Sequence, residues 1–90
     1  MSIQIRLHPL FQQFTDGQDV VITKGRTVGE CLQYLINQFP RVKQRLYDKN
    51  GKLANFVEIY VNAESSYPEE LAKAVKDGDE ITIVAIISGG

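Results

Sequence analysis

The sequence predicts a small α+β domain with two layers, a mixed sheet of four or five strands and one main helix packed on it. Three observations lead to this prediction. Alternating or β-branched hydrophobic segments lie near both ends of the chain, an amphipathic segment with a helix-capping signal lies between them, and 90 residues are enough for one domain. The predicted order is two strands, a helix, a strand, a short element and a last strand. This order provides one helix to cover one sheet.

The first two strands are predicted to form an antiparallel hairpin. Ile3, Ile5 and Leu7 alternate with polar residues, which is the period of a strand with one buried face. Residues 20–23 are β-branched at all four positions, a composition that favours a strand. Two such segments joined by a short connection are typical of antiparallel pairing.

The connection between these strands, residues 8–18, is predicted to be a loop. Asp16-Gly17 supplies a turn signal within it. Leu10, Phe11 and Phe14 make the loop too apolar for a purely solvated connector. We therefore expect these three residues either to tuck under the core or to face a partner.

The clearest helix begins after Thr27. Thr27 and Glu30 have the spacing of a capping box, in which each side chain satisfies a backbone donor of the first turn. Pro40 disfavours helical geometry at the residue before it, so the helix should end near Phe39. Cys31 lies in the middle of the apolar stripe and is expected to be a buried structural cysteine rather than a sulfur site. The stripe consists of Val28, Cys31, Leu32, Leu35, Ile36 and Phe39.

Residues 41–52 are polar and hold five of the ten basic residues of the chain. Such clusters are usually solvated loops, and contact with an acidic partner is the alternative. Val42, Leu46 and Leu53 are expected to attach this segment to the core.

Residues 56–61 are predicted to form the third strand, with Val57, Ile59 and Val61 facing inward. A turn at 62–64 follows. Residues 68–75 are predicted to include a short helical segment, because proline suits the first turn of a helix.

The last strand follows a tight turn at residues 77–79. Its two faces are both largely apolar, with Ile81, Ile83 and Ala85 on one face and Thr82, Val84 and Ile86 on the other. This pattern is typical of a strand inside a sheet, or of an edge strand whose outer side is covered by another protein, and we favour the interior strand. We expect its outer face, together with Ile87, to remain as a docking patch.

Composition excludes several classes of function. A net charge of −1 gives no electrostatic reason to bind nucleic acid or a membrane. One cysteine excludes an internal disulfide and fits a reducing compartment. The uncharged stretch 81–90 is half of the roughly 20 residues that span a bilayer, and the first residues lack a basic and apolar signal pattern, so we expect a soluble, cytoplasmic protein. The single histidine, His8, has no cysteine or carboxylate at ligand spacing and is expected to be an ordinary strand-end residue. A domain of this size leaves little room for an enclosed active site, which favours an accessory protein over an enzyme.

The sequence ends in Ser88-Gly89-Gly90 directly after the apolar last strand. Glycine has no side chain, so this segment can pass through a channel in which a Cβ would clash. We expect residues 1–87 to form the domain and residues 88–90 to form a flexible functional tail. The alternative is that the two glycines arose by chance or by trimming of the chain.

Several motifs together resemble the ubiquitin-like β-grasp sulfur carriers of the ThiS/MoaD family. They are Val61-Asn62 after the third strand, Lys76-Asp77-Gly78-Asp79-Glu80 before the last strand and the final Ser88-Gly89-Gly90. The segments 45–48, 51–53 and 56–62 look most like the branch that includes the cysteine-biosynthesis carrier CysO. Molybdopterin-type members often place prolines before the final Ser-Gly-Gly, where this chain has Ala85-Ile86-Ile87.

The resemblance implies a carrier that is not itself an enzyme. A ubiquitin-activating-type adenylyltransferase would use ATP to adenylate Gly90, and a sulfur donor would convert it to a thiocarboxylate. Gly89 and Ser88 would give clearance in the enzyme channel. The resemblance implies no catalytic residue, no metal and no permanently bound cofactor. The expected docking residues are Phe11, Phe14, Val84, Ile86 and Ile87.

The recipient of the sulfur stays open at this point. A sulfur-containing amino acid, made with a PLP-dependent sulfhydrylase, is the first expectation, and molybdopterin, made with the molybdopterin synthase large subunit, is the second. A protein modifier joined to lysines through Gly90 requires the same tail and activation. A plain interaction module, in which the tail is incidental, is the remaining alternative.

Overall fold

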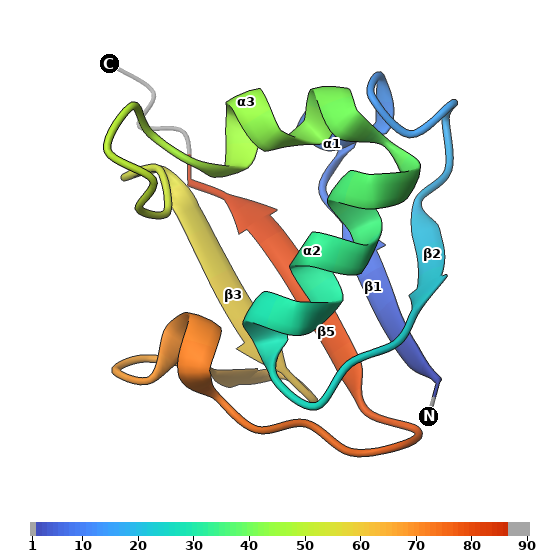
Figure 1. Ribbon diagram of the computed structural model, residues 1–90, viewed down its shortest axis with the longest axis vertical. Coiled ribbons are helices and arrows are strands. Elements are labelled where there is room, and N and C mark those ends of the chain that lie inside the picture. The colour runs from blue at the N-terminus through green and yellow to red at the C-terminus, as the bar shows by residue number, and fades with distance from the viewer. Residues whose placement is uncertain (1, 87–90) are drawn as a thin grey trace.

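The computed structural model describes residues 2–86 (Figure 1). These residues form one sheet with helices on one of its faces, which confirms the predicted α+β class. In chain order the elements are β1 (Ile3–Leu7), α1 (Pro9–Gln12), β2 (Val20–Thr23), α2 (Val28–Gln38), the 3-10 helix η1 (Pro40–Val42), α3 (Lys43–Leu46), β3 (Val57–Val61), β4 (Glu64–Ser65), the 3-10 helix η2 (Glu70–Ala72) and β5 (Glu80–Ala85).

The described strands form a five-stranded mixed sheet in the order β2-β1-β5-β3-β4. β1 and β5 are parallel, and the other neighbours are antiparallel. The last strand therefore lies at the centre, as its two apolar faces predicted. A central parallel pair formed by the first and last strands, with α2 packed across it, is the β-grasp arrangement (Figure 1).

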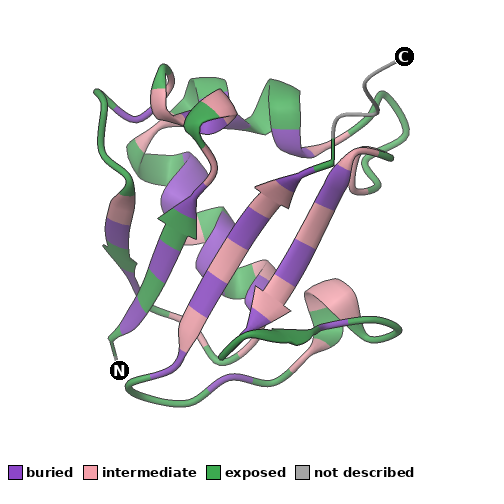
Figure 2. Cartoon of the chain, turned by 180° about the vertical axis from the view of Figure 1, so that it is seen from behind, coloured by how far each residue is buried: buried purple, intermediate pink, exposed green. Residues whose placement is uncertain are grey.

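The pairing register of the strands places the buried residues of β1, β2, β3 and β5 on the same face of the sheet. Ile5 lies between Val21 on β2 and Ile81 on β5, and Ile59 lies opposite Ile83. All five side chains are less than 5% exposed. The alternation of buried and less buried residues along β5 and β3 is visible from behind in Figure 2.

The connection after β1 contains a helical turn, α1, so the prediction of a loop over residues 8–18 was wrong in this part. His8 begins the turn, because its side chain accepts a hydrogen bond from the Leu10 backbone N–H at 3.0 Å, and Pro9 follows at the first helical position. Four residues are too few for a periodic pattern to show in the sequence. Asp16 and Gly17 form the predicted turn, both with positive φ.

Helix α2 confirms the predicted capping signal and apolar stripe. The Thr27 hydroxyl accepts a hydrogen bond from the Glu30 N–H at 3.1 Å. The Glu30 carboxylate reaches back one residue further than in a standard capping box and accepts from the Arg26 N–H at 2.8 Å. Phe39 follows the last helical residue, as Pro40 predicted.

Residues 41–52 are not simply a solvated loop, because they include part of η1 and all of α3. Val42 and Leu46 are fully buried, and Leu53 packs against the core, so the predicted attachment is confirmed. Two buried side chains four residues apart lie on the same side of a helical turn, which explains why this segment folds onto the sheet as a helix.

The second half of the chain follows the predicted order with two differences, one of which is that the short strand β4 begins at Glu64, inside the predicted turn at 62–64. β3 has its three predicted inward residues buried, and the turn after it places Asn62 and Ala63 at positive φ. The predicted short helix over 68–75 is reduced to the 3-10 helix η2. Gly78, at φ +89°, occupies the tight turn before β5.

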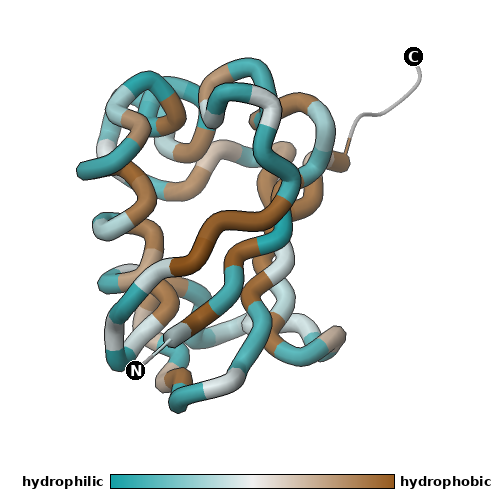
Figure 3. The backbone as a smooth tube through the Cα atoms, turned by 90° about the vertical axis from the view of Figure 1, so that its right-hand side faces the viewer, coloured by the Kyte–Doolittle hydropathy of each residue, from teal (hydrophilic) through white to brown (hydrophobic). Residues whose placement is uncertain are grey.

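The core fills the space between the sheet and α2. Figure 3, in which β2 faces the viewer, shows the hydrophobic run of this edge strand between hydrophilic connections. The fully buried large side chains of the core are Phe11, Ile3, Ile5, Leu32, Leu35, Leu46, Ile59, Ile81, Ile83, Val28 and Val42.

Candidate functional site

The site begins at the end of β5, which is fixed on both sides. The His8 N–H donates to the Ile83 carbonyl at 3.0 Å, and the Ile86 N–H donates to the Phe56 carbonyl at 2.7 Å. These bonds come from segments far away in the sequence, so the end of β5 has a fixed position in the domain. Ile87, Ser88, Gly89 and Gly90, which the sequence predicts to be functional, follow this point and lie outside the described residues.

The predicted docking face of β5 is uncovered by other described elements. Val84 is half-buried and Ile86 is 54% exposed, while Ile83 and Ala85 face the core. Toward the start of the strand this face becomes polar, because Arg6 pairs with Glu80 at 3.3 Å. The apolar part of the outer face therefore lies at the carboxyl end of β5.

The two predicted phenylalanines have different environments. Phe11 has no exposed surface and belongs to the core, so its assignment as a docking residue was wrong. α1 turns this side chain inward, and a side chain without exposed surface cannot contact a partner. Phe14 is half-buried, and its ring lies 5.4 Å from the Arg41 guanidinium and 6.0 Å from that of Arg45. A docking role for Phe14 stays a prediction.

Two exposed hydrophobic side chains were not predicted from the sequence. Ile22 is 51% exposed on β2, and Tyr67 is 75% exposed before η2. Residues 20–22 are all apolar, so they hold no alternation from which an outward residue can be identified. Its register with β1 decides that Val21 points inward and Ile22 outward.

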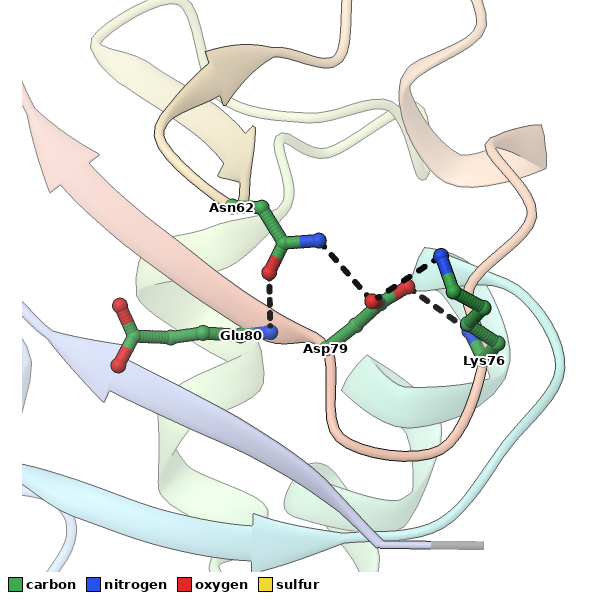
Figure 4. Close-up of polar contacts among 4 residues, drawn as sticks. All are labelled: Asn62, Lys76, Asp79 and Glu80. Carbon is green, nitrogen blue, oxygen red and sulfur yellow. Dashed lines mark hydrogen bonds and ion pairs between the residues drawn. The ribbon is translucent and has the colours of Figure 1, made fainter.

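A polar network fixes the start of β5 (Figure 4). The Asn62 side chain donates to the Asp79 carboxylate at 2.9 Å and accepts from the Glu80 N–H at 2.9 Å. The other oxygen of Asp79 accepts from the Lys76 N–H at 2.9 Å. The hydrogen bond from Asn62, followed by that from Lys76, holds the pKa of Asp79 below its ordinary value. Two of the motifs that carry the family resemblance, Val61-Asn62 and the segment 76–80, are joined by these hydrogen bonds.

Cys31 is fully buried, as predicted, and burial raises the pKa of its thiol. A protonated, buried thiol is a poor nucleophile, which supports its structural role. Within residues 2–86 there is no group of three or more His, Cys, Asp or Glu side chains that would hold a metal ion. Among these residues, too, no helix has the length and apolar character needed to cross a membrane.

Comparison with known proteins places this geometry in a family. A model described as the ThiS family matches residues 9–90. The sulfur carrier protein CysO of Mycobacterium tuberculosis is 34% identical over 93 residues, which cover 100% of both chains.

Two solved structures show the same fold. A chain of the Amycolatopsis orientalis BexX/CysO complex has a TM-score of 0.88 at 31% identity and covers 98% of this chain and 99% of its own. SAMP1 from Haloferax volcanii has a TM-score of 0.87 at 25% identity, with both chains covered completely. Because the family model matches most of the chain and CysO matches its full length, this ubiquitin-like β-grasp protein belongs to the ThiS family.

Proposed function

We propose that this chain is a sulfur carrier and that Gly90 is its sulfur-bearing residue. The observation that supports this most is the full-length similarity to a protein named as a sulfur carrier, CysO. The fold adds a physical reason. A central strand held by backbone hydrogen bonds on both sides gives the segment that follows it a rigid base, from which the segment can enter a partner enzyme.

The proposed chemistry begins with activation of the Gly90 carboxylate. A carboxylate is an anion at neutral pH and a poor target for nucleophiles. On a ubiquitin-activating-type adenylyltransferase it would attack the α-phosphate of ATP, release pyrophosphate and become an acyl-adenylate. Sulfide supplied by a donor would then displace AMP and leave a thiocarboxylate, with its proton passing to solvent. Ser88 and Gly89 are small enough to pass through a narrow channel.

In this proposal the chain is a substrate of its partner enzymes and catalyses no step itself. ATP is used by the activating enzyme, and the carrier holds no permanent cofactor. Since the cycle consumes ATP, we place it in the cytoplasm. Val84 and Ile86, together with Ile87, would dock on the partners. Holding the sulfur on a docked carrier lowers the entropic cost of its reaction.

The first proposed recipient is a PLP-dependent sulfhydrylase that makes cysteine or homocysteine, because the CysO similarity covers the whole chain. The second is molybdopterin synthase, in which this chain would be the small subunit beside the large one. Similarity to SAMP1, whose full name is small archaeal modifier protein 1, supports a different class of function, attachment of Gly90 to lysines of other proteins.

Intact-mass spectrometry tests the proposal. The full chain is incubated with ATP, the adenylyltransferase from the same organism and a sulfide donor. We expect a mass increase equal to the exchange of one oxygen for one sulfur, located by fragmentation at Gly90. A variant lacking Gly89 and Gly90 is the control and should show no increase.

Two results would contradict the carrier proposal. One is an unchanged mass although the enzyme forms AMP, and the other is the same mass increase in the control variant. A series of isopeptide-linked conjugates in cells, with no thiocarboxylate, would support the modifier instead. Fragmentation of the protein isolated from cells would show whether Gly90 is its last residue there.

A further inference from the structure

Two segments of opposite charge lie far apart in this protein. Residues 41–52 contain five basic residues and one acidic residue, whereas residues 64–80 contain six acidic residues and two basic ones. In Figure 1, α3 and the connection after it lie at one end of the longest axis, and η2 with the turn before β5 lies at the other. The two segments therefore carry opposite net charges, +4 (five basic minus one acidic) and −4 (two basic minus six acidic), at opposite ends of a molecule whose net charge is −1.

The basic side chains are not neutralised within the domain. Among residues 2–86, the ion pairs are Arg6 with Glu80 and Lys76 with Asp79, both away from residues 41–52. The only acid of the basic segment, Asp48, uses its carboxylate within the turn, where one oxygen accepts from the N–H groups of Asn50 and Lys52 at 2.8 and 3.0 Å. The positive charge at this end is consequently available to a partner.

The arginines of this segment are held in place. Val42 and Leu46 are fully buried and fix the backbone that carries Arg41 and Arg45. Both guanidinium groups lie over the Phe14 ring, a cation–π contact that restricts their side chains and leaves their N–H edges free to bind carboxylates. Arg41 also lines an open hollow together with Lys43 and Lys49, so three basic side chains of the segment surround it.

The basic segment is linked to the end of β5. The Leu46 carbonyl accepts from the Ala54 N–H at 2.8 Å, and two residues later the Phe56 carbonyl accepts from the Ile86 N–H at 2.7 Å. Figure 1 shows α3 and the tip of β5 at the same end of the molecule. A partner that contacts the outer end of β5 is therefore close to the basic segment.

We propose that residues 41–52 form a docking surface for an acidic protein segment beside the channel of the enzyme that receives Gly90. Opposite charges at the two ends of the carrier would turn its β5 end toward that enzyme before contact, which raises the rate of productive encounters. The assignment of residues 41–52 as a docking surface is independent of the proposed function. Only the identification of the partner as the enzyme that receives Gly90 rests on it. A protein is favoured over nucleic acid because the acidic end and the net charge of −1 repel a polyanion that extends along the molecule.

A decaglutamate peptide, labelled at one end, tests this surface on the full unmodified chain. We expect binding that weakens with salt and amide NMR shifts concentrated at residues 41–52. The double variant Lys43→Gln with Arg45→Gln should weaken binding about threefold to thirtyfold, since each exposed pair contributes modestly. The matched control, Lys24→Gln with Arg26→Gln, removes the same charge from exposed positions outside the segment and should change binding about twofold or less.

Three outcomes would overturn the inference. They are no binding of the peptide, equal weakening by both double variants, and tighter binding of a single-stranded DNA of equal charge at the same residues. Circular dichroism of both variants checks that they are folded. Because the assay involves no sulfur chemistry, it can succeed or fail independently of thiocarboxylate formation at Gly90.

Discussion

The network around Asp79 allows a sharp test of how β5 is held. Replacing Asp79 by asparagine keeps the shape of the side chain and removes its charge and one acceptor. The carboxylate accepts from the Asn62 amide on one oxygen and from the Lys76 N–H on the other, both at 2.9 Å. An amide has one oxygen, so after Asp79→Asn one of these donors would face an NH2 group.

The size of the effect follows from these contacts. A hydrogen bond to a charged group contributes about 1.5–3 kcal/mol, so we expect Asp79→Asn to lower the free energy of unfolding by about 2 kcal/mol at pH 7. For a domain of this length that corresponds to a fall in Tm of roughly 8–16 °C. The Lys76 ammonium, 3.7 Å from Asp79, is 84% exposed and should contribute little.

The effect should depend on pH in a defined direction. In the folded protein the pKa of Asp79 lies below its ordinary value of 3.8. The unfolded chain therefore binds the proton first as pH falls. The stabilisation is complete above the unfolded pKa and is lost as pH falls through the folded pKa. The difference between wild type and Asp79→Asn should be constant from pH 7 to about pH 5 and shrink below about pH 4.

Urea unfolding monitored by circular dichroism at pH 7 and pH 3 measures both effects. Asp19→Asn is the control, since Asp19 is exposed and its side chain makes no hydrogen bond within residues 2–86. It should leave stability at pH 7 within about 0.5 kcal/mol of wild type. If Asp79→Asn were as stable as wild type at pH 7, or if its deficit were the same at pH 3, this account of the network would be refuted.

Two further substitutions test the start of α2 and the docking face. Gly25→Ala would place a Cβ 2.8 Å from the Glu30 Cβ and 2.9 Å from the Cys31 nitrogen, and we expect a loss of about 1–3 kcal/mol in urea unfolding. An unchanged midpoint would show that the first turn of α2 can move aside. Ile86→Asp changes a 54% exposed side chain, so stability should change by less than about 0.5 kcal/mol while kcat/KM of the adenylyltransferase falls about tenfold. A wild-type kcat/KM would remove Ile86 from the docking face.

The long elements were predictable because their signals are local. Strand 3–7 alternates with period two, and the α2 stripe and its Thr27 cap follow the helical period. The central place of β5 was also predictable, since a strand that is apolar on both faces is typical of the interior of a sheet, although the structure covers only one of these faces. The short helices α1 and α3 were missed, because four residues are too few to establish a period.

The sequence by itself determined the fold class, the order of the main elements, the family resemblance and the residues proposed to carry sulfur. Its local patterns suffice for this, since hydrophobic periodicity and capping depend on neighbouring residues. Only the tertiary structure decided that Phe11 is core while Phe14 supports two arginines, and that the basic segment shares one end of the molecule with the tip of β5. These facts depend on how distant segments pack, and residue spacing along the chain carries no information about that.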